Sequence, residues 1–180
     1  MSELRIFTAG SSDQLRQTAD HDEIARLLDE KGVRFEQWDA QLELADDASS
    51  EAIIAGYAKD IERLKAEGGY QAVDVIHMHP EHPDREALRR KFLDEHTHSE
   101  DEVRFFVAGR GLFSLHLGDL VYEVLCERGD LISVPANTPH WFDMGPAPRF
   151  TAIRIFTNPE GWVANFTGSD IAWHHNRLEA

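Results

Sequence analysis

Cysteine is almost absent from this sequence of 180 residues, which contains only Cys126. A single cysteine cannot form an internal disulfide, so we expect a protein of the reducing cytoplasm. Long apolar runs are lacking as well, and none approaches the roughly 20 residues that a membrane-spanning helix needs. The N-terminus has no basic segment followed by an apolar one, so no signal peptide is predicted.

Positive charge is scarce too, because 18 Lys and Arg stand against 33 Asp and Glu and give a formal net charge of −15. Phosphate backbones and anionic membrane surfaces both select clustered Lys and Arg, so nucleic-acid and membrane partners are excluded. Internal repeats and flexible linkers are also missing. We therefore expect one domain over residues 1–180, and a monomer, because no apolar helix face is left over.

Helix signals are concentrated in the first 70 residues, which we expect to form a mostly helical N-terminal annex. Asp20 and Glu23 have the spacing of a capping box before a helix that stops at Gly32. Residues 33–38 are expected to form a short strand and residues 50–67 a second helix. Beyond the annex, the pattern indicates a strand over 70–78 and a short helix over 83–93.

Short β-rich runs replace this pattern after residue 95, separated by Gly and Pro. Many short strands with such turns are typical of an antiparallel sandwich or barrel. The fold class is therefore mainly β with peripheral α-helices, mostly N-terminal, and the barrel core is expected over residues 95–157. The predicted strands cover residues 102–107, 112–117, 120–126, 131–134 and 149–156.

Histidine is the abundant residue, with ten in the chain. His96 and His98 are two residues apart, so in a strand both side chains point to the same side. We expect a tight turn at residues 99–101, with Glu102 opening the next antiparallel strand beside His98. His140 follows a Gly- and Pro-rich corner that begins at Gly129.

Three imidazoles and one carboxylate suit divalent Fe, Ni, Co, Mn or Zn, and leave two positions of an octahedron for a bidentate oxygen ligand. The alternative is that His96 and His98 are surface residues of an acidic loop, but the carboxylate offset and the distal His140 favour a metal. The other paired histidines lack such partners and are interpreted as surface or loop residues: His77, His79 and His82, and His174 and His175. His116 is expected to be a core residue.

These two blocks resemble the two cupin motifs. The first, H-x-H-(x3)-E-(x6)-G, is met by His96, His98, Glu102 and Gly109, and the second by Gly129, Pro135 and His140. Asn137 and Met144 stand where the second motif usually has Gly and Asn. The resemblance implies a small jelly-roll barrel with one metal ion in its mouth.

The likeness extends to the acireductone dioxygenase family in three segments, residues 91–107, 134–143 and 152–156, the last followed by Gly161 and Trp162. It implies that His96, His98, Glu102 and His140 hold one Fe(II) or Ni(II) per chain. It also implies cleavage of acireductone by O2 in methionine salvage. With iron, the products would be formate and 4-methylthio-2-oxobutanoate. With nickel, they would be formate, carbon monoxide and 3-(methylthio)propanoate.

Arg104 lies two residues beyond Glu102, hence on the same strand face. Together with the family likeness, this favours a catalytic and substrate-binding role, in which the guanidinium offsets the charge of an anionic substrate. The alternative is a surface arginine paired with nearby acids. Phe92, Phe142 and Trp162 are expected to surround the methylthio tail, although core packing explains them as well. Arg154 is a weaker candidate for substrate binding, with pairing to an acid at the barrel rim as its alternative.

Two other functions fit the same ligand set. A cupin-type sugar-phosphate isomerase uses similar metal ligands, but it needs cationic groups for phosphate, and the site offers few beyond Arg104 and Arg154. A non-catalytic cupin that binds a metal or small molecule is the third hypothesis, against which the free coordination positions and Arg104 count.

Overall fold

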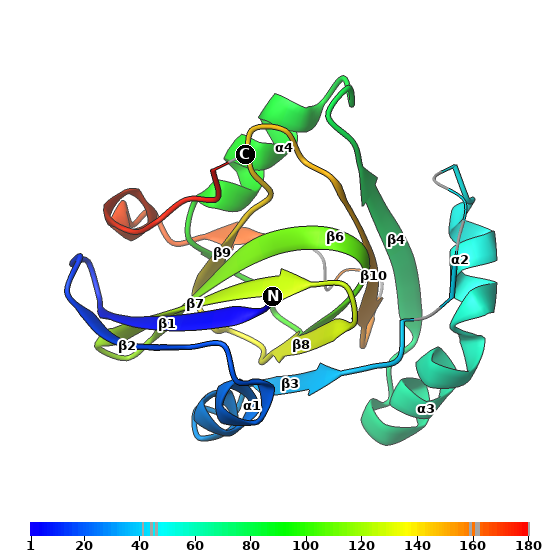
Figure 1. The fold of residues 1–180 in the computed structure, drawn as a ribbon, viewed down its shortest axis with the longest axis horizontal. Helices are drawn as coiled ribbons and strands as arrows, with labels where there is room; N and C mark the ends of the chain where they lie inside the picture. Colours follow the sequence, from blue (N-terminus) through cyan, green and yellow to red (C-terminus); the bar gives the residue numbers. More distant parts are fainter. Residues whose placement is uncertain (41, 44, 46, 159, 161–162, 180) are drawn as a thin grey trace.

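Strands dominate the computed structural model, which describes residues 1–40, 42–43, 45, 47–158, 160 and 163–179. Figure 1 shows them wrapped around a common interior, with α1 below, α2 and α3 beside β4, and α4 above one end. The fold is thus sheet-rich with peripheral helices, as predicted. No helix in the described part of the chain has the length and apolar character needed to cross a membrane.

Helices and strands are mixed in the first half of the described chain, whereas strands predominate in the second half. The strands are β1 (Glu3–Thr8), β2 (Gln14–Thr18), β3 (Arg34–Gln37), β4 (Ala72–Met78), β5 (His96–Thr97), β6 (Glu102–Leu117), β7 (Leu120–Glu127), β8 (Asp130–Val134), β9 (His140–Asp143), β10 (Phe150–Phe156) and β11 (Asn165–Phe166). The helices are α1 (His21–Asp29), α2 (Ser50–Gly56), α3 (Ala58–Gly68), α4 (Arg85–Leu93) and the 3-10 helix η1 (Ile171–His174).

The long strand β6 belongs to both sheets of the barrel. Its first part pairs with β10 and β8, and its second part pairs with β7 and β9. The sequence predicted two strands here, with a break at Gly109. Gly109 instead lets one strand continue, because it has a φ of +74° and a Cβ there would lie 2.0 Å from the carbonyl oxygen of Arg149.

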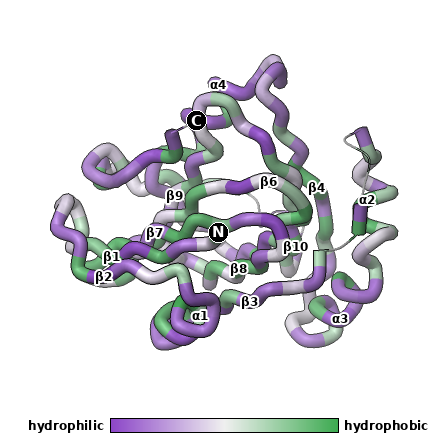
Figure 2. Tube along the Cα trace, in the orientation of Figure 1, coloured by the Kyte–Doolittle hydropathy of each residue, from purple (hydrophilic) through white to green (hydrophobic). Residues whose placement is uncertain are grey.

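Successive side chains of β6 point to opposite faces of the strand and pack in two different apolar clusters. Val103, Phe105 and Val107 pack outward against a cluster formed with α2 and α3, whereas Phe106 and Phe113 pack in the barrel interior. The tube in Figure 2 accordingly shows hydrophobic stretches on the strands around the barrel interior. Glu102 and Arg104 share the inward phase, and this alternation delivers both side chains to the barrel interior.

The predicted helical annex is wrong for residues 3–8 and 14–18, which form β1 and β2. Strand β1 pairs antiparallel with β7 and with β2 and so extends the barrel sheet. The period-2 signal was present, because the buried Leu4 and Ile6 flank Arg5, which is only partly buried. The annex does contain α1, where the Asp20 side chain accepts a hydrogen bond from the Glu23 N–H at 2.9 Å, as the capping spacing predicted.

The predicted helix over residues 50–67 is two helices, α2 and α3, which meet at Tyr57. Tyr57 has φ −112° and ψ 16°, outside the helical region, and its ring packs edge-on against Phe105 at 5.2 Å. The buried contact with the sheet therefore interrupts a helix that the periodicity alone predicts to be continuous.

Candidate metal centre

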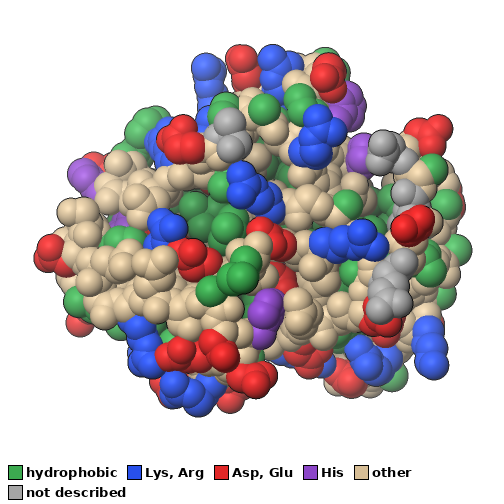
Figure 3. Space-filling model, in the orientation of Figure 1, with side chains coloured by type: hydrophobic (Ala, Val, Ile, Leu, Met, Phe, Trp, Pro, Cys, Tyr) green, Lys and Arg blue, Asp and Glu red, His purple; other side chains and the backbone are tan. Residues whose placement is uncertain are grey.

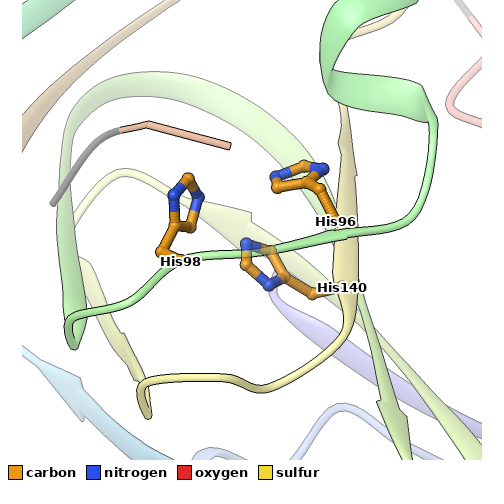
Figure 4. A group of neighbouring side chains, drawn as sticks. All are labelled: His96, His98 and His140. Atoms are coloured by element: carbon orange, nitrogen blue, oxygen red, sulfur yellow. The ribbon is translucent and has the colours of Figure 1, made fainter. Parts of the chain in front are cut away.

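Three imidazole rings converge at one end of the barrel (Figure 4). His96 lies in β5, His98 just beyond it, and His140 at the start of β9, where it pairs directly with His96. The ring centroids are 4.6 to 5.2 Å apart, and one nitrogen of each ring lies within 4.8 Å of the others. In the described part of the chain this is the one group of three or more such side chains with that geometry.

The outer nitrogen of each ring is held by a backbone carbonyl. His96 Nδ1 lies 2.7 Å from the Asp94 oxygen and His140 Nδ1 lies 2.8 Å from the Thr138 oxygen. His98 Nδ1 lies 3.0 Å from the Val163 oxygen. A carbonyl only accepts hydrogen bonds, so each Nδ1 carries the proton and each Nε2 presents a lone pair to the shared space. This tautomer is the one that binds a metal ion.

Glu102 adds a buried carboxylate beside the rings. Its Oε2 lies 3.1 Å from His98 Nε2 and 3.5 Å from His140 Nε2. The chain bends at residues 99–100, within the predicted turn. The expectation that β6 pairs antiparallel with the strand of His96 and His98 is wrong, because β5 pairs with β9 and β11 instead. Contacts between side chains, rather than a shared strand ladder, place Glu102 next to His98.

The second motif segment, which ends at His140, is hydrogen-bonded to the first through Asn137. Its backbone N–H donates to the His98 carbonyl at 2.8 Å, and its φ of +62° is the left-handed conformation that glycine would supply at this motif position. Asn adopts this region more readily than most residues, so the turn survives the departure from the motif, as expected.

Burial sets the charge state of these groups. It lowers the pKa of His96 to about 3, with the nearby His140 acting in the same direction, so this ring is neutral at neutral pH. Burial alone would raise the pKa of Glu102, but Arg104 and the contacts with His140 and His98 outweigh it and hold that pKa well below its ordinary value. The site therefore combines neutral imidazole with a buried carboxylate anion.

Arg104 completes the inner end of the site. Its Nη2 donates to Glu102 Oε1 at 2.5 Å, and its Cζ lies 5.0 Å and 4.7 Å from the ring centroids of Phe113 and Phe142. Its Nε and Nη1 are buried and have no hydrogen-bond partner among the described residues. Burial lowers the pKa of Arg104, but a guanidinium remains charged at neutral pH, so two charged donors stay available to a ligand.

A cavity of about 200 Å³ opens above the rings and is lined by Arg104 and by three other predicted residues, Phe92, Phe142 and Arg154. Arg154 also forms the predicted rim pair, because its Nε lies 2.8 Å from Asp74 Oδ1. Trp162 lies outside the described residues. Sequence reasoning missed the remaining apolar residues that line the cavity, although the strand and helix phases of the first four could have indicated them: Ile76, Leu88, Phe113, Phe156 and Ala164.

Two more histidines differ from expectation, and His116, expected in the core, has a side chain that is 26% exposed. His116 Nδ1 lies 2.7 Å from Glu95 Oε2, and its backbone N–H donates to the carbonyl of Pro139, next to His140. The His175 side chain is 1% exposed and accepts a hydrogen bond from the Gly10 N–H, so it is a loop residue, as one half of its interpretation had it, but not a surface residue. Neither contact is between neighbours in sequence, which is why spacing did not show it.

Helix α4 covers the cavity and is tied down by Arg89. Its guanidinium makes two hydrogen bonds, of 2.8 and 3.1 Å, to the carboxylate of Asp143, which is 1% exposed at the end of β9. We expect Arg89→Ala to lower the free energy of unfolding by about 2–3 kcal/mol, because a buried carboxylate loses its charged partner. Thermal unfolding should shift down by roughly 5–10 °C.

Arg90→Ala is the matched control for this prediction, because Arg90 is the next residue of α4 and is exposed. Its replacement should change the free energy of unfolding by less than about 0.5 kcal/mol. Equal effects of the two substitutions in the same thermal melt would contradict the anchoring of α4 by Arg89.

Comparison with known proteins agrees with this geometry. A sequence model of the ARD/ARD′ family matches residues 3–164. The chain belongs to this family. Among its curated relatives, the acireductone dioxygenase of Alcanivorax borkumensis is 60% identical over 178 residues, 98% of each chain. That of a Synechococcus strain is 68% identical over 150 residues, 83% of each chain.

A solved structure of the acireductone dioxygenase family shows the same fold. The enzyme from Bacillus anthracis, which has a cadmium ion in its active centre, aligns with a TM-score of 0.82 at 34% identity and covers 92% of this chain and 98% of its own. The predicted family and fold class are confirmed, and this member of the family is an enzyme of the dioxygenase class with a three-histidine group suited to a metal ion.

Proposed function

We propose that this enzyme cleaves acireductone (1,2-dihydroxy-3-keto-5-methylthiopentene) with O2 in methionine salvage, in the cytoplasm and with one Fe(II) or Ni(II) per chain. With iron the products are formate and 4-methylthio-2-oxobutanoate, and with nickel they are formate, carbon monoxide and 3-(methylthio)propanoate. The observation that carries the proposal is the set of three carbonyl-oriented imidazoles beside a buried carboxylate, under a cavity lined by Arg104.

The donor set fits the proposed ion. Three neutral imidazole Nε2 atoms and one carboxylate oxygen suit borderline divalent metals such as Fe(II) and Ni(II), and the orientation of each Nδ1 is already fixed. His96, His98, Glu102 and His140 would hold the metal. A bound metal ion supplies Lewis-acid chemistry and a template for the oxygen atoms of the substrate.

Arg104 binds and orients the anionic end of the substrate in this proposal. The enediol beside a ketone is acidic, so the substrate enters as an anion, and the free Nε–H and Nη1–H of Arg104 donate to its oxygen atoms. The third nitrogen of the guanidinium, Nη2, donates to Glu102, and the rings of Phe113 and Phe142 pack against the guanidinium and fix its orientation. The charge is preorganised on a buried side chain, where it acts more strongly than it would in bulk water.

The apolar wall binds the methylthio tail. Phe92 and Phe142 pack edge to face with ring centroids 6.4 Å apart, and Leu88 and Ile76 line the same cavity. A thioether packs well against aromatic rings, and filling this wall also excludes water from the reacting end. Trp162 remains a proposed contact of the tail, and Arg154 a proposed charge at the rim that Asp74 partly neutralises.

Phe92→Ala is expected to raise KM about tenfold with little change in kcat, because the ring contributes uniform binding of the tail and not of the reacting atoms. Steady-state oxygen uptake checks this result. An acireductone analogue that carries methyl in place of the methylthioethyl tail should respond little to the substitution. An equal rise in KM for both substrates would show that Phe92 does not contact the tail.

Oxygen uptake with freshly generated acireductone tests the proposed function. Metal-free protein should show no uptake above the non-enzymatic rate, whereas iron-loaded and nickel-loaded protein should both turn over. The absence of turnover with either metal would reject the proposal. Turnover of a sugar phosphate instead would favour the isomerase alternative, and metal binding without any turnover would favour a non-catalytic binding protein.

A further inference from the structure

Glu95 is a buried acidic residue directly before His96, and its partners lie in distant parts of the chain. Acidic and basic side chains lie near one another over the surface in Figure 3, and exposed pairs of this kind contribute little to stability. Glu95 differs from them because only 4% of the residue is exposed. A buried carboxylate needs hydrogen-bond partners, and those of Glu95 belong to segments that contact or carry the imidazoles of the metal centre.

The first partner of Glu95 is Thr167, at the end of the segment 163–167. The Thr167 hydroxyl donates to Glu95 Oε1 at 2.7 Å, and the Thr167 backbone N–H donates to the Glu95 carbonyl at 3.1 Å. The same segment contains β11, in which Phe166 pairs with His96. Glu95 therefore fastens this segment to the strand of His96 through both its side chain and its backbone.

The segment 163–167 contacts two of the three imidazole rings. The Val163 carbonyl lies 3.0 Å from His98 Nδ1, and the Phe166 ring packs edge-on against the His96 ring with the centroids 5.8 Å apart. The carbonyl that orients His98 thus lies on a segment whose far end is held by Glu95.

The second partner of Glu95 is His116, in the second part of β6. His116 Nδ1 lies 2.7 Å from Glu95 Oε2, and the His116 backbone N–H donates to the Pro139 carbonyl at 2.9 Å. Pro139 directly precedes His140, which pairs with Leu115 of β6. The second carboxylate oxygen therefore connects Glu95 to the pair of strands, β6 and β9, that places the third imidazole.

We propose that Glu95 is a positioning residue of the metal centre, which acts through Thr167 and His116 to hold the three imidazoles in their mutual arrangement. One imidazole follows Glu95 in sequence, and the two oxygens of its carboxylate lead to the segments that position the other two. Ligands that are held in place before a metal ion arrives bind it more tightly, because less ordering remains to be done. The inference rests on the metal centre of the proposed function and not on the identity of the substrate.

Thr167→Val tests this inference with little risk to folding, because Thr167 is exposed and valine has nearly the same shape. The hydroxyl donor is lost, so the segment 163–167 is held less firmly against Glu95. The affinity of the full chain for Ni²⁺ and Zn²⁺, measured by competition with a chelator in the absence of substrate, should fall about tenfold. Amide hydrogen exchange over residues 163–167 should become faster in the same protein.

Thr167→Ser is the rescue variant, because it restores the hydroxyl, and it should bind the metal nearly as tightly as the wild type. Ser169→Ala is the matched control from the same exposed stretch. The Ser169 hydroxyl accepts from the Ile171 N–H at 3.2 Å, farther along the chain, so its loss should leave the metal affinity unchanged.

Metal affinity separates positioning from a role in stability alone, which would lower only the unfolding temperature. Equal affinities of the wild type and Thr167→Val would overturn the inference and leave the proposed function standing. An equal loss in Thr167→Val and Ser169→Ala, or no recovery in Thr167→Ser, would also overturn it. A wild-type chain that binds neither metal would overturn the inference and the proposed function together.

Discussion

His140→Ala is expected to abolish tight metal binding and to lower the rate of oxygen-dependent turnover by at least about a hundredfold. The ring lies at the centre of the site, paired with His96 across β5 and β9 and 3.5 Å from Glu102. Its loss removes one of three converging nitrogen donors to the metal. A bound metal ion contributes several kcal/mol to catalysis as a Lewis acid, and each 1.36 kcal/mol corresponds to a factor of ten in rate. Metal analysis and oxygen uptake on the same preparation measure both effects.

The control for this variant is His174→Ala, which removes an exposed histidine of the C-terminal tail. It should retain the metal content and turnover of the wild type. Circular dichroism must show that the His140→Ala protein is folded. A folded His140→Ala protein with a full metal equivalent and unchanged turnover would exclude His140 from the centre.

Arg104→Met is expected to have two separable effects. The first is a roughly 30- to 1,000-fold fall in kcat/KM, because the substrate anion loses a buried charged donor. This fall corresponds to a loss of about 2–4 kcal/mol in transition-state stabilisation. The second is a loss of about 3–5 kcal/mol in the unfolding free energy of the metal-free protein, because Glu102 is left buried and unpaired. A bound divalent ion replaces the missing counter-charge, so adding metal should restore much of the stability but not the activity.

Arg104→Lys separates charge from geometry. It keeps a cation near Glu102 but loses the planar set of donors and the packing between Phe113 and Phe142, so stability should recover more than kcat/KM does. Thermal unfolding with and without metal, together with steady-state kinetics, gives the comparison. Unchanged kcat/KM in the Arg104→Met protein with intact metal content would contradict the substrate-binding role.

The parts of the site that could be predicted from sequence are those fixed by local spacing. Strand periodicity was enough to place Glu102 and Arg104 on one face, and the structure buries both toward the interior. The pair of Arg154 with Asp74 depends instead on the register of β10 against β4, two strands that are far apart in sequence. Long-range register of this kind has no local signature, so the rim pair could be named only as an alternative.

The fold shows the same division between local and distant causes. The helix start at Asp20 was predictable because capping involves residues three apart. Strand β2 has no buried residue, so hydrophobic periodicity could not reveal it, and its existence depends on pairing with β1. The break at Tyr57 likewise follows from packing on Phe105, which belongs to a strand that comes much later in the chain.

Product analysis is the most direct test of the account, because it asks whether one protein performs both proposed reactions. A single metal-free preparation is divided, loaded with Fe(II) or Ni(II), and supplied with acireductone and O2. The account predicts formate from both portions, 4-methylthio-2-oxobutanoate from the iron form, and carbon monoxide with 3-(methylthio)propanoate from the nickel form. The same products from both forms, or carbon–carbon cleavage by the metal-free protein at the rate of the loaded forms, would contradict it.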